Sequence, residues 1–250
     1  MLKVVSFNIR SVDDKRGYAI KQRAPRLATV LEGYDADVIG FQEYTPLWTE
    51  YIEKYFCDKY EFFNKYRTDT GWREAAPILW KKDTFNCIQR GYFWLSDTPE
   101  QMSGGWDTLP HNRICMYVLL QDKRDGKTFA FFNTHFGFGE ENQIKSVRLV
   151  QSYMQKFAAY PTFIVGDFNM NLSSKAYAEM IKVYADVNEL TIKDRRSTYH
   201  GYKLKNKLDE HIDYCFINEK ITPKFFKIID ERVEKKFPSD HYGIYTELEF

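Results

Sequence analysis

The fold is decided by a short apolar run that ends in polar side chains, Phe163-Ile164-Val165-Gly166-Asp167-Phe168-Asn169. Its β-branched and aromatic residues indicate a buried strand, and a carboxylate and an amide follow where that strand stops. Three other apolar runs end in the same way, namely Val4-Val5-Ser6-Phe7-Asn8, Val38-Ile39-Gly40-Phe41-Gln42-Glu43 and Phe131-Phe132-Asn133-Thr134-His135. Side chains at strand ends can leave the core and converge, so this repetition predicts one mouth lined by polar groups.

The segments around these runs alternate between helical and extended patterns. Helices are expected over residues 21–31, over 47–56 behind Pro46 and over 140–159. A hairpin is expected over residues 114–134, where an Asp-Gly pair marks the turn. Hairpins mixed with helical connections predict an α/β fold, with two packed mixed sheets between outer helices.

The composition is that of an ordinary globular chain. It has 250 residues, of which 44% are hydrophobic and 28% charged, which excludes a disordered or fibrous class. With 36 Lys and Arg against 35 Asp and Glu, the net charge is +1, which does not indicate a globally basic nucleic-acid binder. Every apolar run is shorter than the roughly 18 residues of a membrane span. We expect one domain over residues 1–250, with two small domains as a weaker alternative, and a monomer that does not insert into a membrane.

The cysteines and the start of the chain bear on the compartment. Cys57, Cys87, Cys115 and Cys215 form no CxxC pair, and buried free thiols are expected. Residues 1–7 read directly into a strand and lack the features of a signal peptide. Both observations predict a reducing, cytoplasmic setting.

The polar residues at the strand ends offer oxygen ligands. Glu43 and Asp167 are carboxylates at strand ends, Asp240 precedes the last strand, and amide oxygens accompany them. Each Asp or Asn taken alone could be a turn former, but Glu is not one. Oxygen donors without a thiolate cluster suit Mg²⁺ or Mn²⁺ rather than structural zinc. A magnesium site of this kind usually meets a phosphate, which predicts phosphoryl transfer or phosphate-ester hydrolysis.

Six short motifs together resemble the endonuclease/exonuclease/phosphatase superfamily, the DNase I-like group of nucleases and phosphatases, and most closely its phosphatase-like bacterial branch. The matching stretches run in the family's order from the first strand to the last. They are residues 6–10, 37–43, 133–135 with 166–169, 212–214 and 238–241. The resemblance implies a four-layer α/β sandwich with the site at one end of the paired sheets.

The resemblance also implies roles for individual residues. Glu43 would be the main metal ligand, Asn8 would stand beside it, and Asp240 would join the metal site or orient its neighbour. Asp167 would position or deprotonate the attacking water, while Asn169 and His135 would donate hydrogen bonds to the phosphoryl oxygens. Asp213 would hold His241 in one tautomer. Whether Asp167 or His241 takes the proton stays open.

Two arginines are candidate substrate-binding residues. Arg10 stands two residues after Asn8, where repair nucleases tend to carry a small or acidic group. Arg113 belongs to segments typical of the phosphatase-like branch, and its guanidinium could clamp a phosphate or form a surface ion pair. Glu74 also fits a motif of that branch. The segment after His135 lacks the Asp and second His common in phosphatase-like relatives, which weakens transfer of a particular substrate.

The sequence therefore predicts a Mg²⁺- or Mn²⁺-dependent phosphoesterase acting on a small or lipid-like phosphate ester. A nuclease on single-stranded DNA or RNA is the alternative, because residues 193–207 form a basic run interleaved with aromatic side chains. That run could equally be a solvated loop. A catalytically inactive binding module on the same fold is a third possibility. His111, His200 and His211 show no metal-ligand spacing and are expected to be structural or peripheral.

Overall fold

The computed structural model describes residues 1–107, 111–203 and 210–250, and within them the strands form two six-stranded sheets. The first sheet has the order β11 (Thr222–Ile229), β12 (Gly243–Glu249), β1 (Leu2–Asn8), β2 (Val38–Gln42), β4 (Ile78–Lys81) and β3 (Tyr60–Phe63). The second has the order β5 (Phe85–Trp94), β6 (Ile114–Asp122), β7 (Thr128–His135), β8 (Thr162–Asp167), β10 (Asp213–Ile217) and β9 (Ala185–Asp186). Both sheets are mixed, because β1 and β2 run parallel, as do β7 and β8, among antiparallel neighbours.

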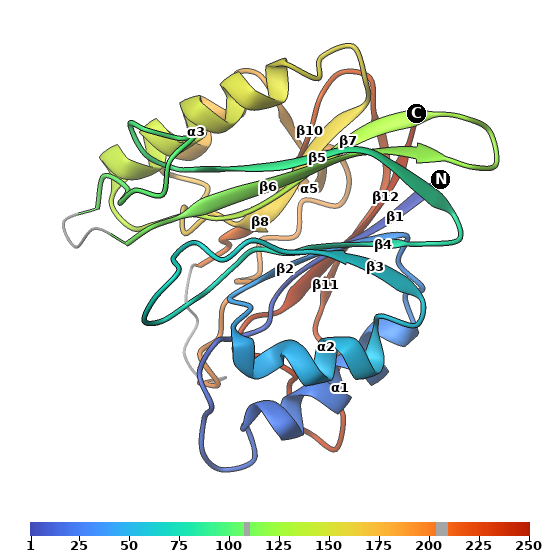
Figure 1. The fold of residues 1–250 in the computed structure, drawn as a ribbon, viewed down its shortest axis with the longest axis vertical. Coiled ribbons are helices and arrows are strands. Elements are labelled where there is room, and N and C mark those ends of the chain that lie inside the picture. Colours follow the sequence, from blue (N-terminus) through green and yellow to red (C-terminus); the bar gives the residue numbers. More distant parts are fainter. Residues whose placement is uncertain (108–110, 204–209) are drawn as a thin grey trace.

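The helices are α1 (Ile20–Glu32), a 3₁₀ turn (Pro46–Trp48) leading into α2 (Thr49–Tyr55), α3 (Glu140–Gln155), α4 (Lys175–Met180) and α5 (Val187–Leu190). Helices α1 and α2 lie outside the first sheet and α3 lies outside the second (Figure 1), whereas the short α5 contacts β10 and β11, one strand of each sheet. Three apolar clusters define the layers. One joins the facing sides of the two sheets, one packs α1 and α2 on the first sheet, and one packs α3 and α4 on the second. This order of helices, sheet, sheet and helices is the expected four-layer sandwich.

A buried polar contact joins the two sheets near one end. Gln42 at the end of β2 donates from Nε2 to Asn133 Oδ1 in β7 at 2.7 Å. Asn133 in turn donates from Nδ2 to the carbonyl oxygens of Phe41 and Pro77, at 2.7 and 2.8 Å. A Cβ at Gly40 would lie 2.7 Å from the Asn133 side chain, so only glycine lets the sheets approach this closely there.

The strand register places the polar strand ends at this same end of the sandwich. Asn8 pairs with Gln42 across the parallel strands β1 and β2, so Glu43 follows beside it. In the other sheet, His135 pairs with Asp167 across β7 and β8, and Asp167 pairs with Asp213 across β8 and β10. Strand pairing therefore places four of the predicted site residues, and Glu43 follows directly after β2.

Two sequence expectations need correction, and one strand was missed. Helix α3 ends at Gln155 rather than Ala159, because the next residues form i→i−3 turns ahead of Pro161. The short strand β3 was not indicated by the sequence. Cys87 is exposed rather than buried, since it lies on β5 at the edge of the second sheet. In the described part of the chain, no helix combines the length and apolarity needed to cross a bilayer.

Candidate active site

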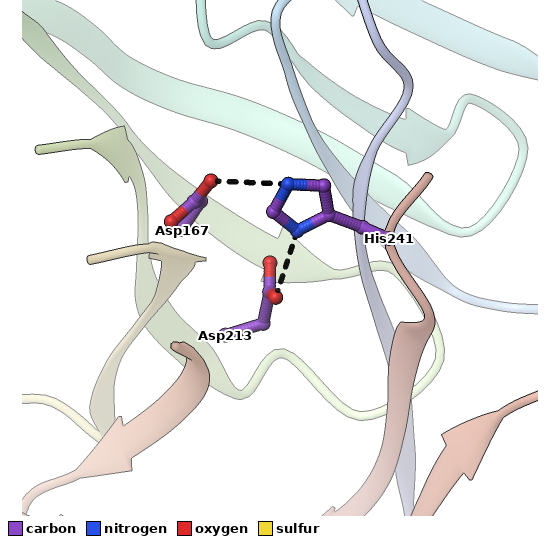
Figure 2. A group of neighbouring side chains, drawn as sticks. All are labelled: Asp167, Asp213 and His241. Carbon is purple, nitrogen blue, oxygen red and sulfur yellow. Dashed lines mark hydrogen bonds and ion pairs between the residues drawn. The ribbon is translucent and has the colours of Figure 1, made fainter. Parts of the chain in front are cut away.

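Two carboxylates hold an imidazole between them at the end of the second sheet (Figure 2). His241 Nδ1 lies 3.1 Å from Asp213 Oδ2, and His241 Nε2 lies 3.7 Å from Asp167 Oδ2. All three side chains are buried. Burial alone would lower the pKa of His241, but the charge and hydrogen bond of Asp213 and the charge of Asp167 raise it. The arrangement favours an imidazolium at neutral pH.

Burial and the charge of Asp213 act on Asp167 in the same direction. Both raise the pKa of the Asp167 carboxyl well above its ordinary value, although His241 and hydrogen bonds from Asn8 and the Asn169 N–H oppose them. Such a carboxyl can change its protonation state close to neutrality. A group with that property suits proton transfer to or from a water molecule.

An amide bridges Asp167 to the first sheet. Asn8 Nδ2 lies 3.0 Å from Glu43 Oε1 and 3.0 Å from Asp167 Oδ2, so the two carboxylates are separated by one nitrogen atom. The other oxygen of Glu43 accepts from the Ser11 backbone N–H at 2.8 Å and from its hydroxyl at 2.7 Å. Burial would raise the pKa of Glu43, but the Ser11 donors, His241 and Asn8 lower it below its usual range.

Glu43 is therefore an ionised carboxylate whose hydrogen-bond partners, Asn8 and Ser11, are neutral groups. A partly buried anion of this kind fits a cation, and the carboxylate and amide oxygens here are the donors that Mg²⁺ or Mn²⁺ prefers. Glu43, Asn8 and Asp240 are the residues that could hold such an ion. Asp167, Asp213 and His241 also bring donor atoms within 4.8 Å of one another, but there His241 already links the two carboxylates.

Backbone strain accompanies the site. Arg10, Glu43 and Asn169 have φ angles of 62°, 59° and 49°, in the left-handed region that non-glycine residues rarely adopt. Each follows the end of β1, β2 or β8 by one or two residues. Residues are kept in this region where the surroundings over-determine their conformation, which is common where side chains must be aimed at one point.

Arg10 has carboxylate partners on each of its guanidinium nitrogens. Nε and Nη2 bind Asp14 at 2.9 and 3.2 Å, and Nη1 binds Asp240 at 3.0 Å. The arginine thus orients Asp240 at the edge of the site. Because both contacts neutralise its charge, Arg10 is less suited than Arg113 to bind a phosphate.

Neutral and cationic groups also lie near Asp167. His135 Nε2 lies 3.1 Å from Asn169 Nδ2 and 3.5 Å from Asp167 Oδ2. Burial, together with the charges of Arg113 and Arg67, holds the pKa of His135 well below its ordinary value, so this ring is neutral. Arg113 is only 8% exposed, and among the described residues its Nε and Nη1 have no hydrogen-bond partner. Because Arg113 also lines the pocket described next, its guanidinium is placed to bind an oxyanion.

One pocket of about 840 Å³ collects these groups. The predicted residues that line it are Arg10, Glu43, Arg113, His135, Asp167, Asn169, Asp240 and His241. Asn8 and Asp213 lie directly behind, hydrogen-bonded to Glu43 and His241. All ten predicted site residues thus meet around one pocket, while their individual roles remain predictions.

Other residues at the site were missed from the sequence. His111 lines the pocket and is not peripheral as expected, and Trp72 also lines it. Ser11, which fixes Glu43, is adjacent to a quoted motif but carries no signal of its own. His200 and His211 are buried and bound to backbone groups, as expected of structural histidines.

Arg23 supports the site from inside the protein. It lies on α1, is 0% exposed, and its guanidinium packs over Trp48 at 5.2 Å. Within the described part of the chain, all its hydrogen bonds go to backbone carbonyls, those of residues 9, 10, 12 and 18. These carbonyls belong to the loop that carries Arg10 and Ser11. A charged residue on the apolar face of a predicted helix was the signal that could have revealed it.

The basic run over residues 193–207 is only partly described. Arg195 pairs with Glu189, and Arg196 pairs with Asp194 and Asp230. Lys205 and Lys207 lie outside the described residues. Nearby carboxylates thus neutralise Arg195 and Arg196. These ion pairs give little support to the idea that the basic run attracts an anionic substrate.

The sequence of residues 5–241 matches the Endonuclease/Exonuclease/phosphatase family. A protein of this family from Bacteroides thetaiotaomicron shares 28% identity and a TM-score of 0.89, with 99% of this chain and 97% of that chain covered. A mannosyl-6-phosphatase of the same species shares 27% identity and a TM-score of 0.89 over 100% of both chains.

More distant structures share the fold alone. TDP2 from D. rerio, in complex with a single-strand DNA product, has 19% identity and a TM-score of 0.76 over 100% of this chain and 99% of that one. None of the curated proteins compared matches the sequence. The family match over nearly the whole chain and the full-length structural likeness lead to one conclusion: the chain belongs to the endonuclease/exonuclease/phosphatase family and has its DNase I-like fold.

Proposed function

We propose that the protein is a divalent-metal-dependent phosphoesterase that hydrolyses a small or lipid-like phosphate ester with an activated water. The single observation that carries this proposal is the ionised Glu43, separated by one amide nitrogen from Asp167, in a pocket that also exposes His241. Membership of a family of phosphoester hydrolases supports the reaction class.

The residues divide the chemistry between them. Glu43, with Asn8 and Asp240, would hold Mg²⁺ or Mn²⁺, which when bound stabilises negative charge on the phosphoryl group. Asp167 would orient the attacking water and accept its proton, because its pKa lies far above that of an exposed carboxyl. The imidazolium of His241, held by Asp213, would donate a hydrogen bond to a phosphoryl oxygen.

Three further residues of the pocket would bind the remaining phosphoryl oxygens. Asn169 and neutral His135 stand next to Asp167, where negative charge builds up in the transition state. Asn169 Nδ2 donates to His135 Nε2 at 3.1 Å and to the Phe136 carbonyl at 2.9 Å, and a phosphoryl oxygen would replace one of these acceptors. Arg113, which lines the pocket, would bind the phosphate through its guanidinium.

The mannosyl-6-phosphatase that is 27% identical to this chain over its full length favours a small substrate. The balanced net charge also offers little electrostatic attraction for a long polyanion.

Cleavage of single-stranded DNA or RNA is the second candidate, because Trp72, Phe138 and Tyr199 line the pocket and could stack on bases. An inactive binding module is disfavoured, since Glu43, Asp167 and His241 are all present and in contact through side chains. We further propose a single-domain, cytoplasmic monomer.

A panel of substrates tests the proposal. Purified protein with Mg²⁺ or Mn²⁺ is assayed side by side on mono- and bis-p-nitrophenyl phosphate, a single-stranded oligonucleotide and plasmid DNA. Hydrolysis of the small esters with intact nucleic acid supports the leading proposal. Cleavage of the oligonucleotide or nicking of plasmid at low enzyme concentration replaces it by the nuclease, and no turnover on any substrate overturns both.

A further inference from the structure

The pocket extends beyond the catalytic groups to an exposed tryptophan. Trp72 lies in the loop between β3 and β4, lines the pocket and is 51% exposed. Its indole N–H donates to Glu74 Oε1 at 2.7 Å. The polar edge of the ring is therefore bound, while much of its apolar surface faces solvent at the mouth of a polar site.

The contact partner of Trp72 is itself fixed in the protein. Glu74 is 8% exposed, and its Oε2 lies 2.9 Å from Nη1 of Arg67, which is also buried. The Arg67 backbone N–H donates to the Glu74 carbonyl at 2.8 Å, and the Arg67 carbonyl accepts from the Trp94 indole at 2.9 Å. A buried ion pair thus anchors the indole to the end of β5, so the ring is held in place before a ligand arrives.

A second aromatic side chain reaches the same pocket from a different loop. Phe138 follows β7, precedes α3 and is 66% exposed. Two large aromatic side chains left exposed at one pocket favour a ligand with an apolar surface of its own. The pocket volume of about 840 Å³ lies within the range of small-molecule sites, roughly 300–1,000 Å³, so it can admit more than a phosphate.

We propose that Trp72 binds a monosaccharide ring in the alcohol part of the ester, while the phosphate lies at the catalytic groups; this inference rests on the proposed function. The C–H face of a sugar ring packs on an indole, and its hydroxyl groups need polar partners close by. Asn171 and Glu210 line the same pocket and can provide them. An acyclic ester has no ring face to offer to Trp72.

The test compares Trp72→Ala and Trp72→Phe with the unaltered protein on three esters: glucose 6-phosphate, adenosine 5′-monophosphate and the acyclic glycerol 3-phosphate. Phe225→Ala, which removes an exposed aromatic ring on β11 far along the sequence from the pocket loops, is the matched control. We expect Trp72→Ala to raise KM for the hexose ester at least about 10-fold with kcat within about twofold, and to change KM for the glycerol ester by less than about twofold. Trp72→Phe should recover most of the loss.

Three outcomes overturn the inference. One is an equal change for the cyclic and acyclic esters, another is no change in KM, and the third is a change confined to the nucleotide, which would identify a nucleobase platform. If no ester is hydrolysed, the proposed function fails separately. Calorimetric titration of glucose 6-phosphate into the unaltered protein and Trp72→Ala then decides the inference, because weaker binding by the variant supports it and equal or absent binding contradicts it.

Discussion

Asp213 Oδ2 accepts a hydrogen bond from His241 Nδ1 at 3.1 Å, although the two residues come from β10 and from the turn before β12. Asp213 starts β10, and the neighbouring strand β8 carries Asp167 opposite it. Sheet register therefore positions these two carboxylates on either side of the imidazole. The contact fixes which nitrogen of His241 faces the pocket and Asp167.

Replacing Asp213 is expected to change the titration of His241. Against the cost of burial, Asp213 and Asp167 raise the pKa of His241 from 6.5 to about 10. In Asp213→Asn one of these charges is lost, so the pKa should fall toward its ordinary value. NMR titration of the imidazole measures it, and an unchanged pKa would show that Asp213 is not the cause.

The same pair makes stability depend on pH. Because the pKa of His241 is higher in the folded than in the unfolded protein, its protonation stabilises the fold. This contribution to the free energy of unfolding is complete below about pH 6.5 and is lost as pH rises toward about 10. Urea unfolding of the unaltered protein should therefore show a decline over this window that is smaller in Asp213→Asn. Parallel curves for the two proteins would contradict the assignment.

Three substitutions test the reacting groups. Glu43→Ala, Asp167→Ala and His241→Ala should each lower turnover at least about 100-fold, as expected for loss of a metal ligand or an acid–base group. Glu219→Ala, at an exposed position after β10, is the control and should leave the rate unchanged. Unchanged turnover in two of the three variants would contradict the proposed mechanism.

Arg23 should control the geometry of the loop before α1. Arg23→Ala leaves several backbone carbonyls without their donor, so we expect a loss of about 3 kcal/mol or more in the free energy of unfolding. Turnover should fall as well, because the loop holds Ser11 against Glu43. Arg23→Lys should restore part of both. Loss of stability with normal turnover would limit Arg23 to a structural role.

Asn133 should hold the two sheets together. Asn133→Ala removes donors to the Phe41 and Pro77 carbonyls and the acceptor of Gln42. We expect unfolding to become easier by about 2 kcal/mol or more, measured by urea denaturation. Asn86→Ala on the exposed part of β5 is the matched control. Equal stability of both variants would show that the contact between the sheets contributes little.

Much of the fold and site could be predicted because the polar residues follow apolar strands directly. The strand ends at Asn8, Glu43, His135 and Asp167 were visible in the sequence, and parallel neighbours bring such ends to one edge. The sandwich followed from hairpins mixed with helices, although boundaries shifted where i→i−3 turns replaced the last helical turn of α3.

What the sequence missed depends on contacts between distant segments. Arg23 looks like a break in an amphipathic pattern until its carbonyl partners are seen. Trp72 looks like an ordinary loop residue until Glu74 and Arg67 fix it beside the pocket. Arg10 was predicted to bind substrate, and only the three-dimensional structure shows that its guanidinium pairs with Asp14 and Asp240.

The account depends on a cation at Glu43, and its most direct test is metal dependence of ester hydrolysis. Protein treated with a chelator and then dialysed is assayed on p-nitrophenyl phosphate as Mg²⁺ or Mn²⁺ is added back, in parallel with Glu43→Gln. We predict that the unaltered protein loses its activity and regains it with the metal, whereas Glu43→Gln stays at least about 100-fold slower at the same metal concentration. Full activity after chelation, or the same metal response in Glu43→Gln, would contradict the account.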